Sequence, residues 1–350
     1  MAESLDKTKA TRQTPFTLMH VCGSHEDTLM KHGLRYLFDT ILDNRIRLVA
    51  GPGCPVCVSP VEDTDLAVAI SKLPNVVVTS YGDMVRVPGS SSSLERERQK
   101  GAQVLTVYSV TDAVKMAREK PDKEVVFISP GFETTAPATA IELTNKPPEN
   151  FSVLSSHRLV PPALEVLANL PDVNLSGMVL PGHVSVIIGR DAYKPFVDKY
   201  KVPSAIAGFE PLDMLLGVAS VVDQLVSGEA QVANMYGRAV TDEGNQKALA
   251  VLSKAFKVVD ATWRGLGVFE KSGMELSDEF AQYNARLRFE VEVEPTKEIP
   301  DGCSCHEVVV GKIEPEDCPL FMSVCKPENP IGPCMVGLEG TCRIRAVYGD

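Results

Sequence analysis

Short apolar segments alternate with amphipathic segments over about the first 260 residues of this chain. Runs rich in apolar and β-branched residues, typical of buried strands, occur at 16–21, 46–50, 75–80, 103–108, 124–129, 151–155, 177–180 and 204–207. Apolar positions with helical spacing lie at 62–72, 111–120, 212–226 and 245–256. Strands that alternate with helices of about ten residues form βαβ units, so the pattern predicts an α/β protein with mostly parallel sheets.

Several predicted strands end in a turn that combines glycine and proline with polar residues. The turns are Gly51-Pro52-Gly53, Pro130-Gly131-Phe132-Glu133, Pro181-Gly182-His183 and Gly208-Phe209-Glu210. Because parallel sheets bind ligands beside the carboxyl ends of their strands, we expect these turns to line one shared crevice. Glu133 and Glu210 are candidate acid/base groups, although either could equally cap the following helix. We expect His183 to be a turn residue rather than a ligand.

The length of 350 residues exceeds that of one ordinary core and predicts two or three domains. A polar, proline-rich stretch at 145–150 indicates one boundary, and the character of the sequence changes again at 262. We therefore expect α/β domains at 15–145 and 146–262, followed by a cysteine-rich domain at 263–350. An amphipathic helix is predicted within the last domain, at 277–287.

The composition is that of a globular protein, with 44% hydrophobic and 23% charged residues. The net charge of −11 argues against nucleic acid as a partner, because phosphate binding requires a basic face. No segment reaches the roughly 18 consecutive apolar residues of a membrane-spanning helix, and residues 1–14 lack the apolar core of a secretory signal. The expected location is therefore the cytoplasm.

The nine cysteines fall into three groups: Cys22 alone, Cys54 with Cys57, and six in the last 48 residues. The spacing of Cys54 and Cys57 allows both sulfurs to bind one metal ion or to form a small disulfide ring. In an intracellular α/β protein this pattern favours a redox-active pair over buried structural thiols. We expect the preceding Gly-Pro-Gly turn to place both sulfurs near the surface.

Cys22 occupies the predicted start of a helix, in the sequence Cys22-Gly23-Ser24-His25-Glu26. A helix N-terminus stabilises a thiolate, so Cys22 is a candidate low-pKa nucleophile or metal ligand. His25 lies three positions later on the same helical face, and a thiolate with an imidazole suits a late first-row metal such as iron. A helix cap beside an ordinary histidine explains the same residues equally well.

The cysteines of the tail indicate a metal or cluster site; they are Cys303, Cys305, Cys318, Cys325, Cys334 and Cys342. Structural zinc would require two closely spaced pairs, and only Cys303 and Cys305 are close together. A four-iron cluster requires four thiolates, and the wide, uneven spacing fits it better. Four of the six cysteines would then be ligands, and the spacing alone does not choose them.

Seven motifs, in order over residues 19–348, resemble the HypD family of nickel–iron hydrogenase maturation factors. They are Met19-His20-Val21-Cys22-Gly23-Ser24-His25-Glu26, Gly51-Pro52-Gly53-Cys54-Pro55-Val56-Cys57, Gly131-Phe132-Glu133-Thr134-Thr135, Pro181-Gly182-His183-Val184-Ser185, Gly208-Phe209-Glu210-Pro211-Leu212-Asp213, Trp263-Arg264-Gly265-Leu266-Gly267 and Gly332-Pro333-Cys334-Met335-Val336. The resemblance implies two Rossmann-like α/β domains with parallel sheets that face a central cleft, and a C-terminal domain with one [4Fe–4S] cluster.

The resemblance also implies roles for the cysteines. The family's cluster ligands are separated by twelve, six and sixteen residues, and this spacing is reproduced by Cys305, Cys318, Cys325 and Cys342. Cys22 would bind an iron ion jointly with a cysteine of the partner HypC, with His25 nearby as a ligand or proton carrier. Cys54 and Cys57 would cycle between dithiol and disulfide. The partner HypE would supply cyanide to the iron, which also receives carbon monoxide.

Two other functions fit the same residues. A cluster-dependent thiol–disulfide reductase acting on protein partners would use Cys54 and Cys57, and Cys22 and His25 would then be incidental. A zinc-stabilised binding protein would have neither a cluster nor redox activity.

Overall fold

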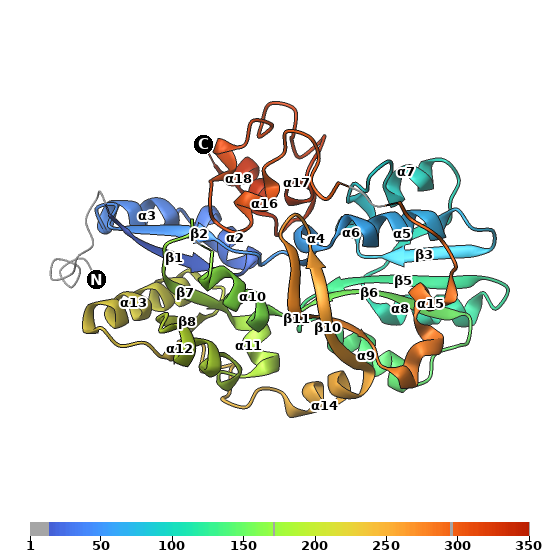
Figure 1. Ribbon diagram of the computed structural model, residues 1–350, viewed down its shortest axis with the longest axis horizontal. Helices are drawn as coiled ribbons and strands as arrows, with labels where there is room; N and C mark the ends of the chain where they lie inside the picture. The colour runs from blue at the N-terminus through green and yellow to red at the C-terminus, as the bar shows by residue number, and fades with distance from the viewer. Residues whose placement is uncertain (1–13, 171, 295–296, 350) are drawn as a thin grey trace.

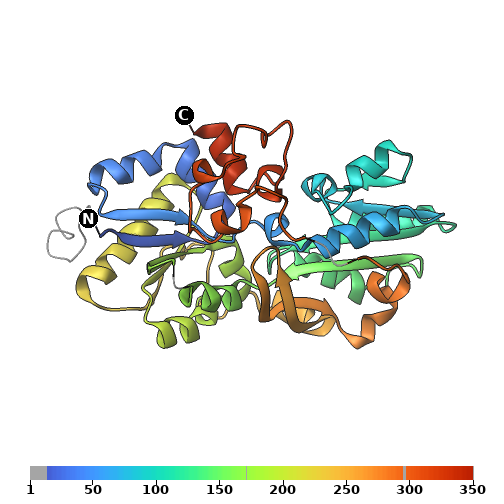
Figure 2. The same cartoon turned by 45° about the horizontal axis from the view of Figure 1, so that its top comes forward.

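The structure, a computed structural model, describes residues 14–170, 172–294 and 297–349. Two β-sheets flanked by helices lie side by side, and the cysteine-rich C-terminal region lies across the junction between them (Figure 1). The turned view in Figure 2 shows the same arrangement, with the C-terminal region above the junction. The predicted α/β fold with two largely parallel sheets is confirmed.

The first sheet is entirely parallel and has the strand order β2-β1-β7-β8-β9. Its strands are β1 (Phe16–His20), β2 (Ile46–Ala50), β7 (Leu175–Pro181), β8 (Ser204–Ala207) and β9 (Val232–Asn234). The neighbours β1 and β2 pair in register from Phe16 with Ile46 to His20 with Ala50, so the turns that follow them emerge side by side.

The second sheet has the strand order β10-β11-β6-β5-β3-β4. Its parallel strands are β3 (Val76–Ser80), β4 (Val104–Thr106), β5 (Glu124–Gly131) and β6 (Phe151–Arg158). An antiparallel hairpin of β10 (Phe256–Trp263) and β11 (Gly267–Leu276) extends it beyond β6. The sequence pattern predicted the parallel strands but not this hairpin.

The helices connect the strands and form the C-terminal region. Those of the first part of the chain are α2 (Gly23–Lys31), α3 (Leu34–Ile41), α4 (Pro55–Val58), α5 (Val61–Ser71), α6 (Gly82–Arg86), α7 (Leu94–Gln99), α8 (Val110–Glu119) and α9 (Ala136–Thr144). The middle part contains α10 (Val160–Ala168), α11 (Gly182–Ile188), α12 (Lys194–Tyr200), α13 (Pro211–Ser227) and α14 (Gln246–Ala255). The last part contains α15 (Ala285–Arg288), α16 (Cys305–Val308), α17 (Pro333–Val336) and α18 (Thr341–Tyr348), and the short 3-10 helices are η1 (Asp191–Tyr193), η2 (Asp278–Tyr283) and η3 (Pro315–Asp317).

The predicted continuous helix at 277–287 is wrong. This segment forms η2 and α15 instead, which meet at Asn284, and η2 itself is kinked at Phe280, whose φ is −111°. Asn284 then starts α15 as its N-cap, because its side chain accepts a hydrogen bond from the Arg286 N–H. Apolar spacing predicts which face of this segment is buried, but the capping asparagine ends one helix and starts another.

The chain passes between the sheets more than once. Each sheet contains strands from both sides of residue 145, because β1 and β2 pair with strands after 174, whereas β3, β4 and β5 pair with β6 and the hairpin. The expected division at 145 therefore does not coincide with the sheets.

Both faces of the second sheet are buried. Val125 and Phe127 of β5 enter a core with α8, α9 and α14, whereas Val126 and Ile128 enter a core that continues to the cysteines of the C-terminal region. This alternation follows from the opposite directions of successive strand side chains. The C-terminal region is therefore part of the largest core and not a separate appendage.

A buried ionic network joins the C-terminal helix to the helix after β1. The Glu26 carboxylate of α2 is fully buried, 2.9 Å from Nη2 of Arg35 and 3.5 Å from Nε of Arg345 on α18. Its Oε2 is also 2.9 Å from Nε2 of His20. Burial acts to raise the pKa of Glu26, but the positive charge of Arg35 and the hydrogen bond from His20 hold it well below its usual range.

We expect Glu26→Gln to lower the free energy of unfolding by about 3 kcal/mol, because it removes the nearest carboxylate of the buried Arg35 and leaves only Glu314, 3.6 Å away, to balance that charge. Urea unfolding at pH 7 measures this loss. The matched control is Glu119→Gln, which removes an exposed carboxylate 3.9 Å from Lys115 and should change stability by less than about 0.5 kcal/mol. Equal effects of the two substitutions would contradict a stabilising role for the network.

Candidate functional site

The site lies at the carboxyl ends of β1 and β2. Cys22 follows β1, and the turn that carries Cys54 and Cys57 follows β2. The Gly51 N–H donates to the His20 carbonyl at 2.8 Å, which continues the pairing of the two strands into their turns. A Cβ atom on Gly53 would lie 2.3 Å from the backbone of Cys22, so only glycine allows this approach. The turn that leads to Cys54 thus packs directly against Cys22.

Cys22 is a buried N-cap residue of α2, with 1% of its surface exposed. Burial, together with the nearby carboxylate of Glu339, raises the pKa of the Cys22 thiol to about 12. The low thiol pKa expected from the helix N-terminus is therefore wrong for this structure. Backbone N–H groups of Ser24 and His25 do lower the pKa, but desolvation outweighs them.

His183 lies closer to Cys22 than the sequence indicated. Both of its ring nitrogens are 3.9 Å from Sγ of Cys22, and its ring stacks on Phe209 with centroids 5.1 Å apart. Burial lowers the pKa of His183 to about 4, so the imidazole is neutral at pH 7. The sequence did contain one signal for this position of His183: the Pro181-Gly182 turn is one of the turns predicted to line a shared crevice.

His25 is fully buried beside the same Phe209 ring, with centroids 5.4 Å apart. Its Nε2 donates to the Ala207 carbonyl at 3.3 Å, whereas Nδ1 has no hydrogen-bond partner among the described residues. Burial and the charges of His20 and His183 lower the pKa of His25 to about 3. A neutral imidazole with an unpaired nitrogen has the form that a metal ligand requires.

Glu339 is a further residue of this site that the sequence analysis missed. It lies just before α18, and its Oε1 accepts a hydrogen bond of 2.9 Å from the Ser24 hydroxyl. Burial raises the pKa of this carboxyl, and its charge in turn raises the pKa of Cys22. No pattern links it to Cys22, since the two residues are 317 positions apart.

Cys54 and Cys57 form a disulfide at the start of α4, with their Cα atoms 5.3 Å apart. The two residues are 5% and 1% exposed, so the expected placement near the surface is wrong. The segment around α17 covers them: the Pro333 carbonyl lies 3.9 Å from Sγ of Cys57, and a Cβ on Gly337 would lie 3.1 Å from Sγ of Cys54.

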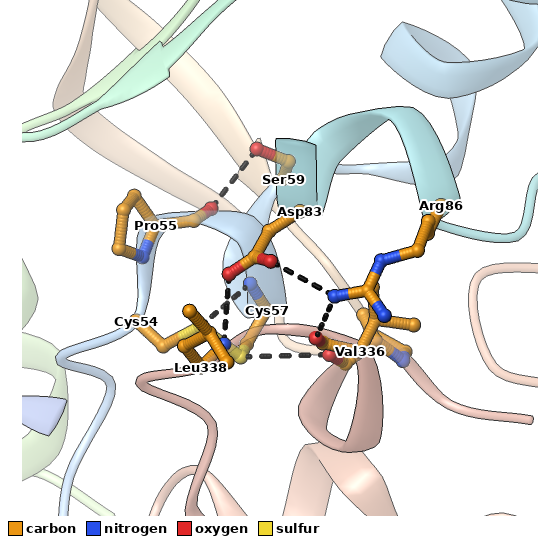
Figure 3. Close-up of a disulfide and its surroundings, with 9 residues drawn as sticks. Cys54, Pro55, Cys57, Ser59, Asp83, Arg86, Val336 and Leu338 are labelled. Carbon is orange, nitrogen blue, oxygen red and sulfur yellow. Dashed lines mark hydrogen bonds and ion pairs between the residues drawn. A yellow bond between two sulfur atoms is a disulfide. The ribbon is translucent and has the colours of Figure 1, made fainter. Parts of the chain in front are cut away.

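Two polar contacts hold this covering segment in place (Figure 3). Asp83 accepts a hydrogen bond of 2.8 Å from the Leu338 N–H, and Arg86 donates to the Val336 carbonyl at 3.3 Å. Asp83 and Arg86 also pair with each other at 3.0 Å. Helix α6, which carries both residues, therefore fixes the cover over the disulfide.

The six tail cysteines line one small enclosed cavity, together with Phe321, Gly332 and Met335. Cys318 and Cys325 accept hydrogen bonds from the backbone N–H groups of Ser304 at 3.5 Å and of Ile331 at 3.3 Å. Among the described residues, no three His, Cys, Asp or Glu side chains are arranged to hold a single metal ion. The cavity offers only thiols, and backbone N–H groups donate hydrogen bonds to two of their sulfurs. These donors fit an iron–sulfur cluster rather than a single metal ion.

One short helix separates the cavity from the disulfide. Cys334 of α17 lines the cavity, and the preceding residue, Pro333, contacts Cys57 through its carbonyl. The turn between β10 and β11 supports the same region, because the Arg264 N–H donates to the Val58 carbonyl at the end of α4 at 2.9 Å. Cys22, the disulfide and the cavity thus belong to one packed unit.

The two glutamates of the strand-end turns act as helix caps. Oε1 of Glu133 accepts a hydrogen bond of 2.9 Å from the Val160 N–H at the start of α10. Glu210 is exposed and forms a capping box with Asp213 at the start of α13. Glu133 differs from Glu210 in being only 2% exposed, and burial raises its pKa to about 7.

A family model described as "Hydrogenase formation hypA family", with the short name HypD, matches residues 1–349. The chain belongs to the HypD family. Hydrogenase maturation factors HypD of Azotobacter vinelandii and Escherichia coli strain K12 are each 40% identical to it, over 97% and 95% of this chain and 91% and 89% of their own length. The corresponding factor of Cupriavidus necator is also 40% identical, over 95% of this chain and 90% of its own.

Membership of the HypD family shows that the chain is a hydrogenase maturation factor. Among the helices of the described residues, none has the length and apolar character needed to cross a membrane.

The raised pKa of Glu133 predicts a measurable effect on stability. Its folded-state pKa of about 7 lies above the ordinary value of 4.5, so the folded protein binds an extra proton between these pH values and loses stability as the pH rises through that window. Glu133→Gln should remove this loss. From pH 4.5 to pH 8, the free energy of unfolding of the parent chain should therefore fall by roughly 3 kcal/mol more than that of the variant.

Urea unfolding of both proteins from pH 4.5 to pH 8 measures this difference. Glu119→Gln serves as the control, since this carboxylate is exposed and its substitution should leave the pH dependence unchanged. If the free energy of unfolding of Glu133→Gln and of the parent chain changed with pH in the same way, the pKa of the Glu133 carboxyl would not be raised, and the prediction would be wrong.

Proposed function

We propose that this chain is an iron-binding scaffold that combines a redox-active dithiol with a [4Fe–4S] cluster. Its cargo would be an iron ion that receives two cyanide ligands and one carbon monoxide for nickel–iron hydrogenases. The observation that carries the proposal is the packing of Cys22, the Cys54–Cys57 disulfide and the cysteine-lined cavity around two adjacent strand ends. The reducing cytoplasm is the compartment in which such thiols would work.

Iron binding is assigned to Cys22 and His25, completed by a cysteine of HypC in a stable complex. His183 is a candidate histidine ligand in place of His25, because both of its ring nitrogens lie 3.9 Å from Sγ of Cys22. The thiol must lose its proton when iron binds, and its raised pKa keeps it protonated before then. Glu339, hydrogen-bonded to Ser24, is the nearby carboxylate that can take up this proton.

Cys305, Cys318, Cys325 and Cys342 would hold the cluster, since they line one cavity and have the family's spacing. When bound, the cluster would supply one-electron transfer. The backbone N–H groups at Cys318 and Cys325 stabilise negative charge on these sulfurs. Cys303 and Cys334 line the same cavity and are not assigned as ligands.

The dithiol form of Cys54 and Cys57 would provide the two electrons for cyanide release. HypE, acting as a transient partner, would present a thiocyanate group, R–S–CN. Two cysteine thiols reacting with it would give R–SH, HCN and the Cys54–Cys57 disulfide, so that the S–CN bond breaks and the S–S bond forms. Reopening the disulfide then consumes two electrons and two protons.

The alternative is a reductase for protein disulfides, and the cover over Cys54 and Cys57 would have to open in either function. The scaffold is favoured because a reductase would leave Cys22 and His183, whose Sγ and ring nitrogens lie 3.9 Å apart, without a role. The zinc-stabilised alternative is disfavoured by the cavity, which offers six thiols in place of two tight pairs.

Anaerobic reconstitution with iron and sulfide tests the cluster assignment. Substituting any one of Cys305, Cys318, Cys325 or Cys342 by serine should abolish the broad visible absorbance and the bound sulfide. Cys303→Ser is the matched control from the same cavity and should retain both. Retention in one of the four variants, or loss in the control, would mean that the ligand set is different.

Iron analysis of the purified complex with HypC tests the role of Cys22. The complex should contain iron beyond the four atoms of the proposed cluster. Cys22→Ala should lose this additional iron but keep the cluster absorbance. A complex of the Cys22→Ala chain that still holds the extra iron would remove Cys22 from the site.

A further inference from the structure

The turn between β10 and β11 lies beside α4, below the C-terminal region in Figure 1. This turn carries Arg264, whose main-chain N–H donates to the Val58 carbonyl at the end of α4. On its other side, a Cβ on Gly265 would lie 2.7 Å from Cβ of His306, the residue that follows Cys305. The turn therefore packs against both the helix of the disulfide and the first helix of the cysteine-rich region.

The side chain of Arg264 is buried without a carboxylate partner. Its exposed fraction is 1%, and its Nε and Nη2 donate to the Glu298 and Pro88 carbonyls at 3.0 Å and 2.9 Å. Nη1 has no hydrogen-bond partner among the described residues. The other buried arginine of the described residues, Arg158, has the Asp63 carboxylate 3.7 Å away. Arg264 is thus held by neutral carbonyls, and its positive charge is left uncompensated.

The strongest source of negative charge for Arg264 is the cysteine-lined cavity. Burial lowers the pKa of Arg264, and the largest opposing effect comes from negative charge on Cys305, ahead of the effects of Glu298 and Cys303. Both cysteines line the cavity. A guanidinium group keeps its proton in proteins, so a buried one requires a negative counterpart. The cavity is the place in this structure where that counterpart can form.

We infer that Arg264 is the counter-charge of the [4Fe–4S] cluster and raises the reduction potential of the cluster. This inference rests on the cluster assignment proposed above. A four-iron cluster with four thiolate ligands carries a net negative charge, and one-electron reduction makes that charge more negative. A positive charge buried nearby therefore stabilises the reduced form more than the oxidised form, because charges are weakly screened in a protein interior.

The position of the charge does not depend on the cavity being filled. The carbonyls that hold the guanidinium belong to Pro88, in the connection between α6 and α7, and to Glu298, which precedes the cysteines of the tail. Neither residue lines the cavity. The positive charge is therefore fixed in place beforehand, and little reorganisation is needed when the charge of the cluster changes.

A spectroscopic redox titration of the reconstituted chain tests this inference. Titanium(III) citrate supplies electrons under anaerobic conditions, and visible absorbance measures the ratio of reduced to oxidised cluster. At the midpoint potential of the parent chain, Arg264→Gln should lower this ratio at least tenfold, which corresponds to about 59 mV for one electron. Arg264→Lys retains the charge and should keep the ratio within about threefold of the parent value.

The matched control is Arg118→Gln, because this arginine is exposed on α8, whose apolar side chains join the core that does not contain the cysteines. The ratio should stay within about twofold of the parent value, since solvent and salt screen an exposed charge. Loss of the cluster in Arg264→Gln but not in Arg264→Lys would also show that the charge is required.

Two kinds of result would overturn the inference, and they are distinguishable. An unchanged ratio in Arg264→Gln, or equal loss of the ratio or of the cluster in the glutamine and lysine variants, would remove the role of the Arg264 charge and leave the cluster assignment intact. A parent chain that binds no sulfide on reconstitution would overturn the cluster assignment and this inference together.

Discussion

The close approach of three backbone segments around the disulfide is the constraint on which the rest of the structure depends. The turn after β2 must pass the backbone of Cys22 at Gly53, and the segment after α17 must pass the disulfide sulfurs at Gly337. A side chain at Gly53 would occupy space that the Cys22 backbone already fills, and one at Gly337 would crowd Sγ of Cys54 at 3.1 Å. The positions of the three cysteine groups relative to one another follow from these two contacts.

The crossing of the chain between the sheets makes this approach possible. Because β1 and β2 belong to the first sheet and β3 to the second, the segment with Cys54 and Cys57 is the connection from one sheet to the other. The C-terminal region closes over that connection and is anchored on both sides. Arg345 reaches Glu26 of α2, whereas Leu338 and Val336 reach Asp83 and Arg86 of α6.

The sequence predicted the parts of the fold that depend on local periodicity. Apolar spacing predicted four of the helices and the parallel strands other than β9, and the rule that strand ends share an edge predicted that the turns after them would gather on one side. Contacts between distant segments leave no local pattern. Glu339 beside Cys22, the cover over the disulfide and the pairing of the hairpin with β6 were therefore missed.

The errors about the thiols have one physical cause. A turn and a helix N-terminus were expected to mean exposure and a low thiol pKa, but the C-terminal region buries both sites. Desolvation then outweighs the helix N-terminus at Cys22. The Pro181-Gly182 turn indicated that His183 lies at the shared crevice, but its contact with Cys22 requires β7 to lie next to β1, and the sequence pattern did not predict that pairing.

The rate at which thioredoxin reduces the Cys54–Cys57 disulfide tests the account most directly. At chosen times the reaction is quenched by alkylation, and mass spectrometry measures the fraction of chains in which the disulfide has opened. The native chain is treated with thioredoxin and, in a parallel sample, with dithiothreitol. A urea-unfolded chain reduced by dithiothreitol gives the rate for an exposed disulfide. If the C-terminal segment seals the disulfide, thioredoxin should act on the native chain at least about 100-fold more slowly than on an exposed disulfide. Native reduction at the rate of an exposed disulfide would contradict a disulfide that the C-terminal segment covers.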